Sequence, residues 1–280
     1  KPSIPFVTAT EAIQQIQSNS TVFLHGSAAT PVRLINELVS QKERLQNVEL
    51  ISITQQGVNL NDPSLAGHFY MNSLFVSESN RKAISQGMGD YTPVFLSEIP
   101  LLFNRNILEV DVAIVSVSPP DKHGYCSLGT SVDIVKSALR SAKMVIAQVN
   151  PNMPRVHGDG FIPFSRFDMA VWTDDPLPEV SYASGATTIT RQIGKIVAEL
   201  VEDEATLQLG IGSIPDAVLA NLTNHKNLGL HTEMFSDGVI PLIQNGTINN
   251  SRKKIVKGYC VTSFMLGTKA LYDFADDNPI

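Results

Sequence analysis

The sequence is poor in the side chains that build disulfide frameworks and metal centres. It has two cysteines among 280 residues, Cys126 and Cys260, which are far apart and belong to no C-x-x-C pair. Its six histidines show no H-x-x-x-H spacing. A disulfide-stapled fold and a zinc-type site are therefore not expected, and both thiols are expected to be reduced in a cytosol-like compartment.

Long hydrophobic runs and runs of like charge are also missing. No stretch is apolar over the length that a transmembrane helix needs, and no segment resembles a signal peptide. The chain begins at Lys1 without a methionine, so a leader could have been removed. A net charge of −6 argues against nucleic acid as the main partner. We therefore expect a cytoplasmic protein, or a mitochondrial one in a eukaryote, with no membrane partner.

The residues that are present alternate between short apolar segments and amphipathic ones. A capping box, T-A-T-E at 8–11, begins the first helix. Strands alternating with helices predict an α/β fold whose mainly parallel sheets are covered by helices on both faces. The strands are expected at 21–26, 47–54, 111–118, 142–149 and 206–210, and the helices at 31–45, around 131–140 and from residue 183 onward.

The segment T-D-D-P-L-P-E-V-S-Y-A-S at 173–184 is rich in proline and acidic residues. It is the best candidate for a linker, and an ordinary surface loop is the alternative. Segments 21–54 and 206–234 also share one plan of strand, glycine and serine, proline, helix and strand. We therefore predict two related α/β domains, at 1–184 and 185–280. Because the chain stops soon after one helix, the second domain is expected to be truncated.

A glycine-bearing junction, L-G-I-G-S-I-P-D-A-V at 209–218, follows a predicted strand and opens a predicted helix. Gly210 and Gly212 permit a close backbone approach, and Ser213 and Asp216 have the spacing of a capping box. N–H groups at such a junction attract anions. The segment is therefore either an anion-binding loop or a tight turn without a ligand.

One glutamate, Glu233, stands in a segment, 228–238, that is typical of a buried strand end followed by a glycine turn. An unpaired buried carboxylate is costly, so we expect Glu233 to have a partner or a function. In a βαβ unit the end of the second strand lies beside the glycine loop that follows the first strand. The carboxylate and the loop are therefore expected to face one crevice.

Two chemistries fit that arrangement. In a dinucleotide site, an acid about twenty residues beyond a G-x-G-x-x-G motif binds ribose. Pro215 occupies the third glycine position here, and little chain follows Glu233, which disfavours this interpretation. In the favoured one, Glu233 is a nucleophile that forms a covalent acyl intermediate, while loop N–H groups stabilise an oxyanion or hold an anionic cofactor.

The chain strongly resembles the acetyl-CoA hydrolase/transferase group of CoA-transferases, which includes the 4-hydroxybutyrate CoA-transferases. The resemblance spans essentially the whole chain. It is carried by the segments VFLHGSAATP, YTPVFLSEIPLLF, SPPDKHGYCSLG, NPNMPRVHGDGFI, LGIGSIPDAVLANL, LGLHTEMFSDGVIPLIQNGTINN and FMLGTKALYDFADDNP.

The resemblance implies a CoA-transferase (NagB/RpiA-like) fold of two open-sheet domains in a homodimer or larger oligomer. It implies that Glu233 becomes a glutamyl-CoA thioester and that the loop at Gly210, Ile211, Gly212, Ser213 and Ile214 contacts CoA. The reaction moves CoA between an acyl-CoA and a short-chain carboxylate of the acetate, butyrate or 4-hydroxybutyrate type, without a metal. An acyl-CoA hydrolase is the near alternative, and a non-enzymatic CoA- or nucleotide-binding module is the distant one.

Other polar residues are interpreted as structural or as secondary. His231 and Glu233 match the H-x-E of zinc deaminases, but the companion P-C-x-x-C is absent, so no metal is expected. His25 is expected to be a satisfied structural histidine, and Trp172 a core residue. The irregular segment at 150–160 is expected to form a lid or wall of the active site, with a well-packed loop as the alternative.

Overall fold

A computed structural model describes residues 4–182 and 185–280 and divides the chain into two compact units, Lys1–Pro178 and Glu179–Ile280. The boundary predicted after residue 184 lies close to this division. Residues 183 and 184, where the long helix was expected to begin, lie outside the described residues. Within the described ranges, no helix combines the length and the apolar character that crossing a membrane requires.

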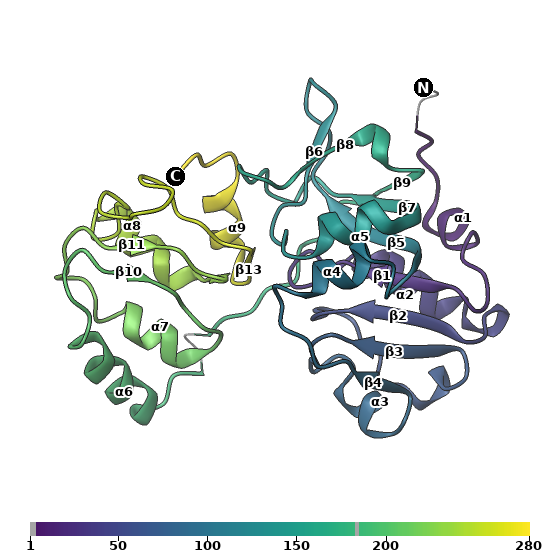
Figure 1. Cartoon of the computed structure of the whole chain (residues 1–280), viewed down its shortest axis with the longest axis horizontal. Coiled ribbons are helices and arrows are strands. Elements are labelled where there is room, and N and C mark those ends of the chain that lie inside the picture. Colours follow the sequence, from purple (N-terminus) through teal and green to yellow (C-terminus); the bar gives the residue numbers. More distant parts are fainter. Residues whose placement is uncertain (1–3, 183–184) are drawn as a thin grey trace. The chain divides into compact units, whose positions relative to one another are not determined.

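The first unit is built on one seven-stranded sheet with the strand order β4-β3-β2-β1-β5-β7-β9 (Figure 1). Every pairing in this sheet is parallel, which confirms the predicted α/β class. The order changes direction between β1 and β5. The strands are β1 (Thr21–Leu24), β2 (Val48–Ser52), β3 (Phe69–Ser73), β4 (Gly89–Tyr91), β5 (Val110–Val117), β7 (Ala142–Val149) and β9 (Met169–Trp172).

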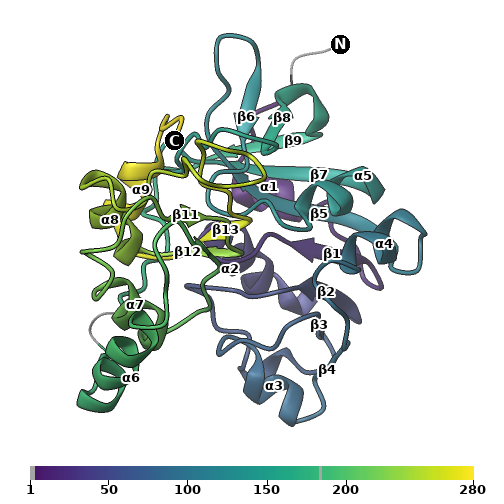
Figure 2. The ribbon, with the colours of Figure 1, turned by 60° about the vertical axis from the view of Figure 1, so that its left-hand side comes forward.

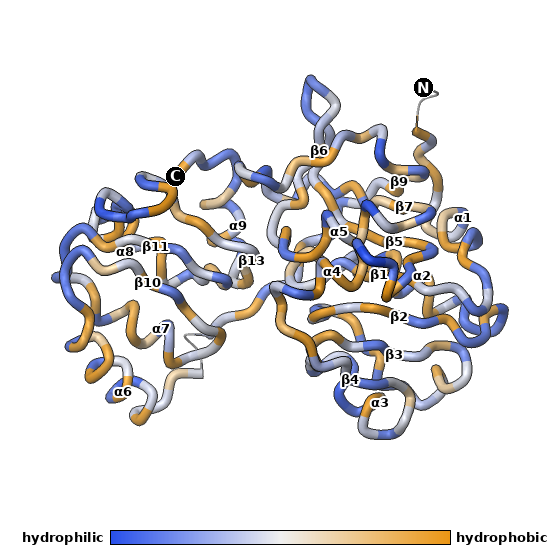
Figure 3. The backbone as a smooth tube through the Cα atoms, in the orientation of Figure 1, coloured by the Kyte–Doolittle hydropathy of each residue, from blue (hydrophilic) through white to orange (hydrophobic). Residues whose placement is uncertain are grey.

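Both faces of this sheet are covered, because its strands are apolar on both sides. Phe23 belongs to one buried cluster and its neighbour Leu24 to the other. Figure 3 shows the resulting hydrophobic stretches along β5 and β7. The first cluster contains residues of α4 (Ile99–Asn104) and α5 (Val135–Ser141), and the second contains residues of α1 (Ala9–Ile13), α2 (Val32–Ser40) and α3 (Arg81–Ser85).

The predicted capping box at the start of α1 is confirmed. The Thr8 hydroxyl oxygen accepts from the N–H of Glu11 at 3.2 Å, and the Glu11 carboxylate accepts from the N–H of Thr8 at 2.8 Å. Two N–H groups that the helix itself leaves unpaired are thereby satisfied.

His25 follows β1 and is completely buried. Its Nδ1 accepts from the N–H of Ser116 at 3.2 Å, so the ring proton lies on Nε2, which donates to the carbonyl of Ser131 at 2.8 Å. Burial lowers the pKa of His25 to about 4, and the Ser131 carbonyl only partly opposes this. The N–H of Ser116 can only donate, so it also favours the neutral ring. These contacts fit a structural histidine.

The prediction that Trp172 is a core residue is wrong, since 53% of its surface is exposed. It ends β9, the edge strand of the sheet, and its ring lies 6.2 Å from that of Phe6. The segment around Phe6 pairs with β9 at Ala170, two residues before Trp172, and this pairing does not cover the last residue of the strand.

The segment at 150–160 is held by contacts within the first unit. Arg155 donates to the Asp121 carboxylate at 2.6 Å and to the Tyr125 carbonyl at 3.2 Å, and its guanidinium lies 4.5 Å from the Phe161 ring centre. It packs beside the antiparallel pair β6 (Tyr125–Ser127) and β8 (Phe161–Pro163). These contacts are those of a well-packed loop, the alternative interpretation.

The second unit contains short parallel strand pairs, β10 with β11 and β12 with β13, together with helices (Figures 1 and 2). Helices α6 and α7 pack closely at Gly194 of α6 and Ala217 of α7. This contact is possible because Gly194 has no side chain. The elements are α6 (Thr188–Ala198), β10 (Thr206–Leu207), α7 (Ser213–Leu219), β11 (Gly229–Leu230), β12 (Met234–Phe235), α8 (Ile240–Gln244), β13 (Phe264–Met265) and α9 (Lys269–Ala275).

Candidate functional site

Glu233 lies between β11 and β12, and its side chain is exposed. The prediction of a buried carboxylate is therefore wrong. Along this segment burial alternates, with Thr232 and Met234 inside and His231 and Glu233 outside. The period of two that defines an extended chain thus places the carboxylate on the open face. Glu233 is therefore accessible to a reacting partner.

The parallel strands β10 and β11 lead into the glycine loop and the Glu233 segment. Leu207 of β10 pairs with Leu230 of β11, and this pairing ends three residues before Gly210 and Glu233. Beyond it the N–H of Leu209 donates to the Thr232 hydroxyl oxygen, so the start of the glycine loop lies beside the Glu233 segment within the second unit.

Two side-chain hydrogen bonds fix the Glu233 segment to the loop on either side of it. Before Glu233, the Thr232 hydroxyl oxygen accepts from the N–H of Leu209 at 2.8 Å. After it, the Ser236 hydroxyl donates to the Asp216 carboxylate at 2.7 Å. The main chain at Glu233 is thus anchored to both ends of the glycine loop.

The capping box predicted at Ser213 and Asp216 is wrong. Gly212 is the N-cap of α7 and provides no side-chain cap, while the Asp216 carboxylate bonds Ser236 instead. Burial raises the pKa of Asp216, and the nearby Asp237 carboxylate adds to the rise, whereas the Ser236 hydrogen bond lowers it. A long-range partner has replaced the local one that the spacing suggested.

The glycine loop presents unused donors. The N–H groups of Gly210, Ile211 and Gly212 donate to no other residue in the ranges 4–182 and 185–280. Gly212 has a φ of +121°, a conformation that other residues rarely adopt. Ile211 and Ile214 are 53% and 41% exposed, so apolar side chains flank the free N–H groups. The loop therefore offers donors and an apolar border to a ligand.

The other neighbour of Glu233 is the segment Thr262–Ser263, which sequence reasoning did not identify. The main-chain carbonyl oxygen of Glu233 accepts from the N–H groups of Ser263 and Phe264, both at 3.1 Å. It also lies 2.8 Å from the Thr262 hydroxyl and 3.0 Å from the Ser263 hydroxyl. The sequence contains little signal for it, because V-T-S-F-M at 261–265 shares only its threonine and its two apolar last positions with H-T-E-M-F at 231–235.

A buried lysine, also missed, joins the same two segments. Lys253 is only 4% exposed, and its Nζ donates to the carbonyl oxygens of Leu230 at 2.9 Å and Tyr259 at 2.6 Å. Burial lowers the pKa of Lys253. Lys253 thereby links Leu230, three residues before Glu233, to Tyr259, three residues before Thr262.

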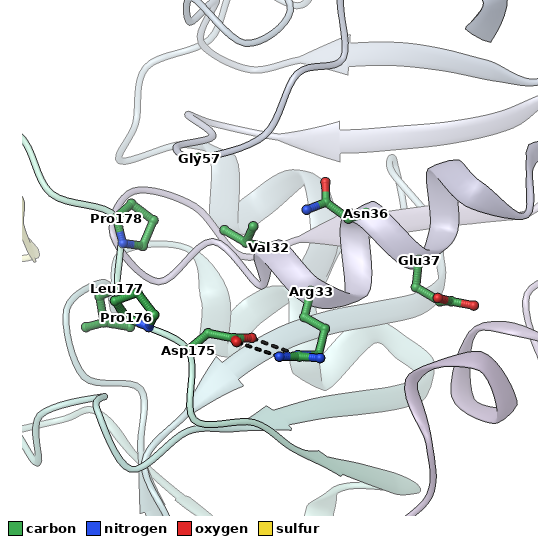
Figure 4. A pocket seen from close by; sticks show the side chains of 9 residues that line it. All are labelled: Val32, Arg33, Asn36, Glu37, Gly57, Asp175, Pro176, Leu177 and Pro178. Carbon is green, nitrogen blue, oxygen red and sulfur yellow. Dashed lines mark hydrogen bonds and ion pairs between the residues drawn. The ribbon is translucent and has the colours of Figure 1, made fainter.

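Among the described residues, no group of three or more His, Cys, Asp or Glu side chains could hold a metal ion. A groove of about 650 Å³ in the first unit is lined by Arg33, Gly57 and the Asp175–Pro178 segment, and Arg33 bonds Asp175 there at 2.5 and 2.7 Å (Figure 4). None of the predicted site residues lines this groove.

Comparison with known proteins gives consistent matches. Residues 5–182 match the acetyl-CoA hydrolase/transferase N-terminal domain. The chain is 49% identical over 269 residues to a succinyl-CoA:acetate/propanoyl-CoA:succinate CoA transferase of Fasciola hepatica, covering 95% of this chain and 56% of the relative. It is 46% identical over 275 residues to a 4-hydroxybutyrate coenzyme A transferase of Clostridium kluyveri, covering 98% of this chain and 64% of the relative.

Solved structures agree with these matches. A 4-hydroxybutyrate CoA-transferase from Porphyromonas gingivalis aligns with a TM-score of 0.83 and 35% identity, over 98% of this chain and 66% of that one. RipA from Yersinia pestis aligns with a TM-score of 0.92 and 31% identity, over the same shares of the two chains. The chain spans less than two thirds of the length of the two curated relatives.

Proposed function

The chain belongs to the acetyl-CoA hydrolase/transferase family, and on that premise we propose that its protein transfers CoA between an acyl-CoA and a free short-chain carboxylate. The observation that carries the proposal is the setting of Glu233. Its carboxylate is exposed, its main chain is fixed from both sides, and the hydrogen bond between Leu209 and Thr232 joins its segment to a loop whose N–H groups at 210–212 donate to none of the described residues.

The proposed reaction uses Glu233 as a nucleophile. Its carboxylate attacks the carbonyl carbon of the acyl-CoA, and the C–S bond breaks to give a mixed anhydride and CoA thiolate. The thiolate then attacks the glutamyl carbonyl carbon, which forms the enzyme-bound CoA thioester and releases the first acid. An acceptor carboxylate reverses both steps and leaves as the new acyl-CoA.

The loop from Gly210 to Ile214 has two tasks in this proposal. Its free N–H groups donate to an oxyanion or to a polar group of CoA, and the exposed Ile211 and Ile214 contact apolar parts of the substrate. Binding energy from the distant parts of CoA then holds the reacting carbonyl in place.

Hydrolysis is the second candidate, because the exposure of Glu233 leaves room for water to attack the same intermediates. The relatives named above differ in the acids that their names give as donors and acceptors. The test of the proposal must therefore also identify the acid that this protein uses. We also propose that this protein is a homodimer and is located in the cytoplasm. Light scattering checks the first statement, and cell fractionation checks the second.

The test is the intact mass of the full-length protein after incubation with acetyl-CoA, followed by peptide mapping. We expect a CoA-sized adduct that hydroxylamine removes and that maps to the peptide containing Glu233. Glu233→Gln should abolish the adduct and the transfer to acetate, butyrate or 4-hydroxybutyrate. Glu202→Gln, an exposed glutamate of the same unit, is the matched control and should retain both.

Three outcomes would reject or replace the proposal. Release of free acetate without acyl transfer would identify a hydrolase. Unchanged CoA binding with no chemistry in either variant would identify a binding module. An adduct that persists in Glu233→Gln would place the nucleophile elsewhere.

A further inference from the structure

More donors surround the main-chain carbonyl of Glu233 than it can accept. A carbonyl oxygen has two lone pairs, whereas four donors, two N–H groups and two hydroxyls, lie within 3.1 Å of this one. The N–H groups of Ser263 and Phe264 are part of the main chain at β13 and cannot turn away. The hydroxyls of Thr262 and Ser263 can rotate, so they are the two donors that are able to leave the Glu233 carbonyl oxygen.

The two hydroxyls differ in what else they can reach. The Thr262 hydroxyl lies 2.9 Å from the carbonyl oxygen of Phe264, which gives it a second acceptor inside the fold. The Ser263 hydroxyl makes no second hydrogen bond to the part of the chain that the structure describes. If it leaves the Glu233 carbonyl, that carbonyl keeps its two main-chain donors. Of the four donors, the Ser263 hydroxyl can therefore turn to another acceptor with the smallest loss of hydrogen bonding within the fold.

The register shows where a redirected hydroxyl would point. His231 is level with Val261 and Met234 with Phe264, so Glu233 is level with Ser263 on the neighbouring parallel strand. Side chains at the same level of adjacent strands stand on the same face. Both are accessible, since Glu233 is exposed and Ser263 is half-buried.

We propose that Ser263 is a further catalytic residue of this site, and that its hydroxyl turns from the main-chain carbonyl of Glu233 to the reacting γ-carbonyl of the same residue. The inference rests on the proposed function, because it concerns the step in which CoA thiolate attacks the glutamyl anhydride. There the C–S bond forms, the C–O bond to the acyl group breaks, and the acid leaves as its carboxylate. Ser263 keeps its proton throughout and donates a hydrogen bond to the oxyanion of the tetrahedral intermediate.

The size of the effect follows from other oxyanion donors. Removing one such donor lowers the rate of the chemical step by about 10²- to 10³-fold. Ser263→Ala removes only the hydroxyl and leaves both main-chain N–H donors to the Glu233 carbonyl. We therefore expect a fall on the order of 100-fold in the rate of glutamyl-CoA formation, with an unchanged KM for acyl-CoA and an unchanged melting temperature.

The experiment is rapid-quench mass spectrometry of the full-length protein with acetyl-CoA. Ser263→Thr keeps a hydroxyl and should restore most of the rate. Thr262→Val, the matched control, removes the neighbouring hydroxyl and should lower the melting temperature while changing the adduct rate much less than Ser263→Ala does. If Ser263→Ala does not fold, Ser263→Cys replaces it, because a thiol of similar size is a weak donor and should also be slow.

The outcomes separate this inference from the proposed function. A wild-type protein without an adduct would overturn both. A wild-type adduct that forms at the same rate in Ser263→Ala would leave the transferase intact and overturn the role of Ser263. Equal losses of rate and of melting temperature in the Ser263 and Thr262 variants would show a structural role only, which also overturns it.

Discussion

Acidification should destabilise the first unit through a single buried side chain, His25. Its neutral ring is fixed between the N–H of Ser116 and the carbonyl of Ser131, and burial lowers the pKa of His25 to about 4, against an ordinary 6.5. Above pH 6.5 the ring is neutral in both the native and the unfolded chain, so its contribution is fully present. Between pH 6.5 and 4 only the unfolded chain binds the proton, and stability is lost as the pH falls.

The size of the loss follows from the gap between the two pKa values. At about 1.4 kcal/mol per pH unit, the gap corresponds to about 3 kcal/mol of unfolding free energy lost by pH 4. That is a substantial part of the total stability of an ordinary domain. The lone tryptophan, Trp172, belongs to the first unit, so its fluorescence reports the unfolding of that unit in urea.

The assay compares urea unfolding of wild type and His25→Gln at several pH values from 7.5 to 4.5. Other groups titrate in both proteins, so the difference between their pH slopes isolates His25. We expect the variant to be less stable at pH 7 and to lose less stability on acidification. Equal slopes for the two proteins, or an NMR titration of the His25 ring with a midpoint near 6.5, would refute the reasoning.

Three further changes have expected outcomes. Gly194→Ala should destabilise the second unit by about 1–3 kcal/mol, because the new Cβ would lie 2.6 Å from the carbonyl carbon of Ala217. Thermal unfolding measures this loss. Gly185→Ala is the control and should be neutral, because its Cβ would meet open space. Gly212→Ala should cost about 1–3 kcal/mol and weaken CoA binding by calorimetry, because its φ is +121°; unchanged binding would contradict a role for the loop. Lys253→Met should cost about 1–3 kcal/mol, because it removes the donor to the Tyr259 carbonyl, whereas the Leu230 carbonyl still accepts from the N–H of Val261; an unchanged denaturation midpoint would show that water replaces the ammonium group.

Local patterns predicted the parts of this protein that depend on neighbouring residues. The capping box at Thr8 formed because its two partners are three residues apart, and β1, β2, β5 and β7 formed where apolar runs predicted strands, whereas β3 and β4 were not predicted. The same reasoning failed at Ser213 and Asp216, where the spacing was right but Asp216 found Ser236 twenty positions later. A local hydrogen bond forms only if no distant partner competes for the same atoms.

The sequence indicated which residues to examine better than it indicated how exposed their side chains are. Glu233 was singled out because a carboxylate is costly when buried, yet its side chain lies on the open face of the segment. Trp172 was expected in the core and ends an edge strand instead. Both errors concern which face of a strand is covered, and that depends on elements far away in the sequence.

The sequence by itself determined the α/β class and the strand–glycine–helix junction at 209–218, because each depends on residue types and spacing along a few turns of chain; it also singled out Glu233 as the candidate nucleophile. Only the tertiary structure decided that Lys253, Thr262 and Ser263 gather around the main chain of Glu233. Those contacts join strands about thirty residues apart, and the register of a parallel pair is set by packing across the whole sheet. No local pattern contains that information.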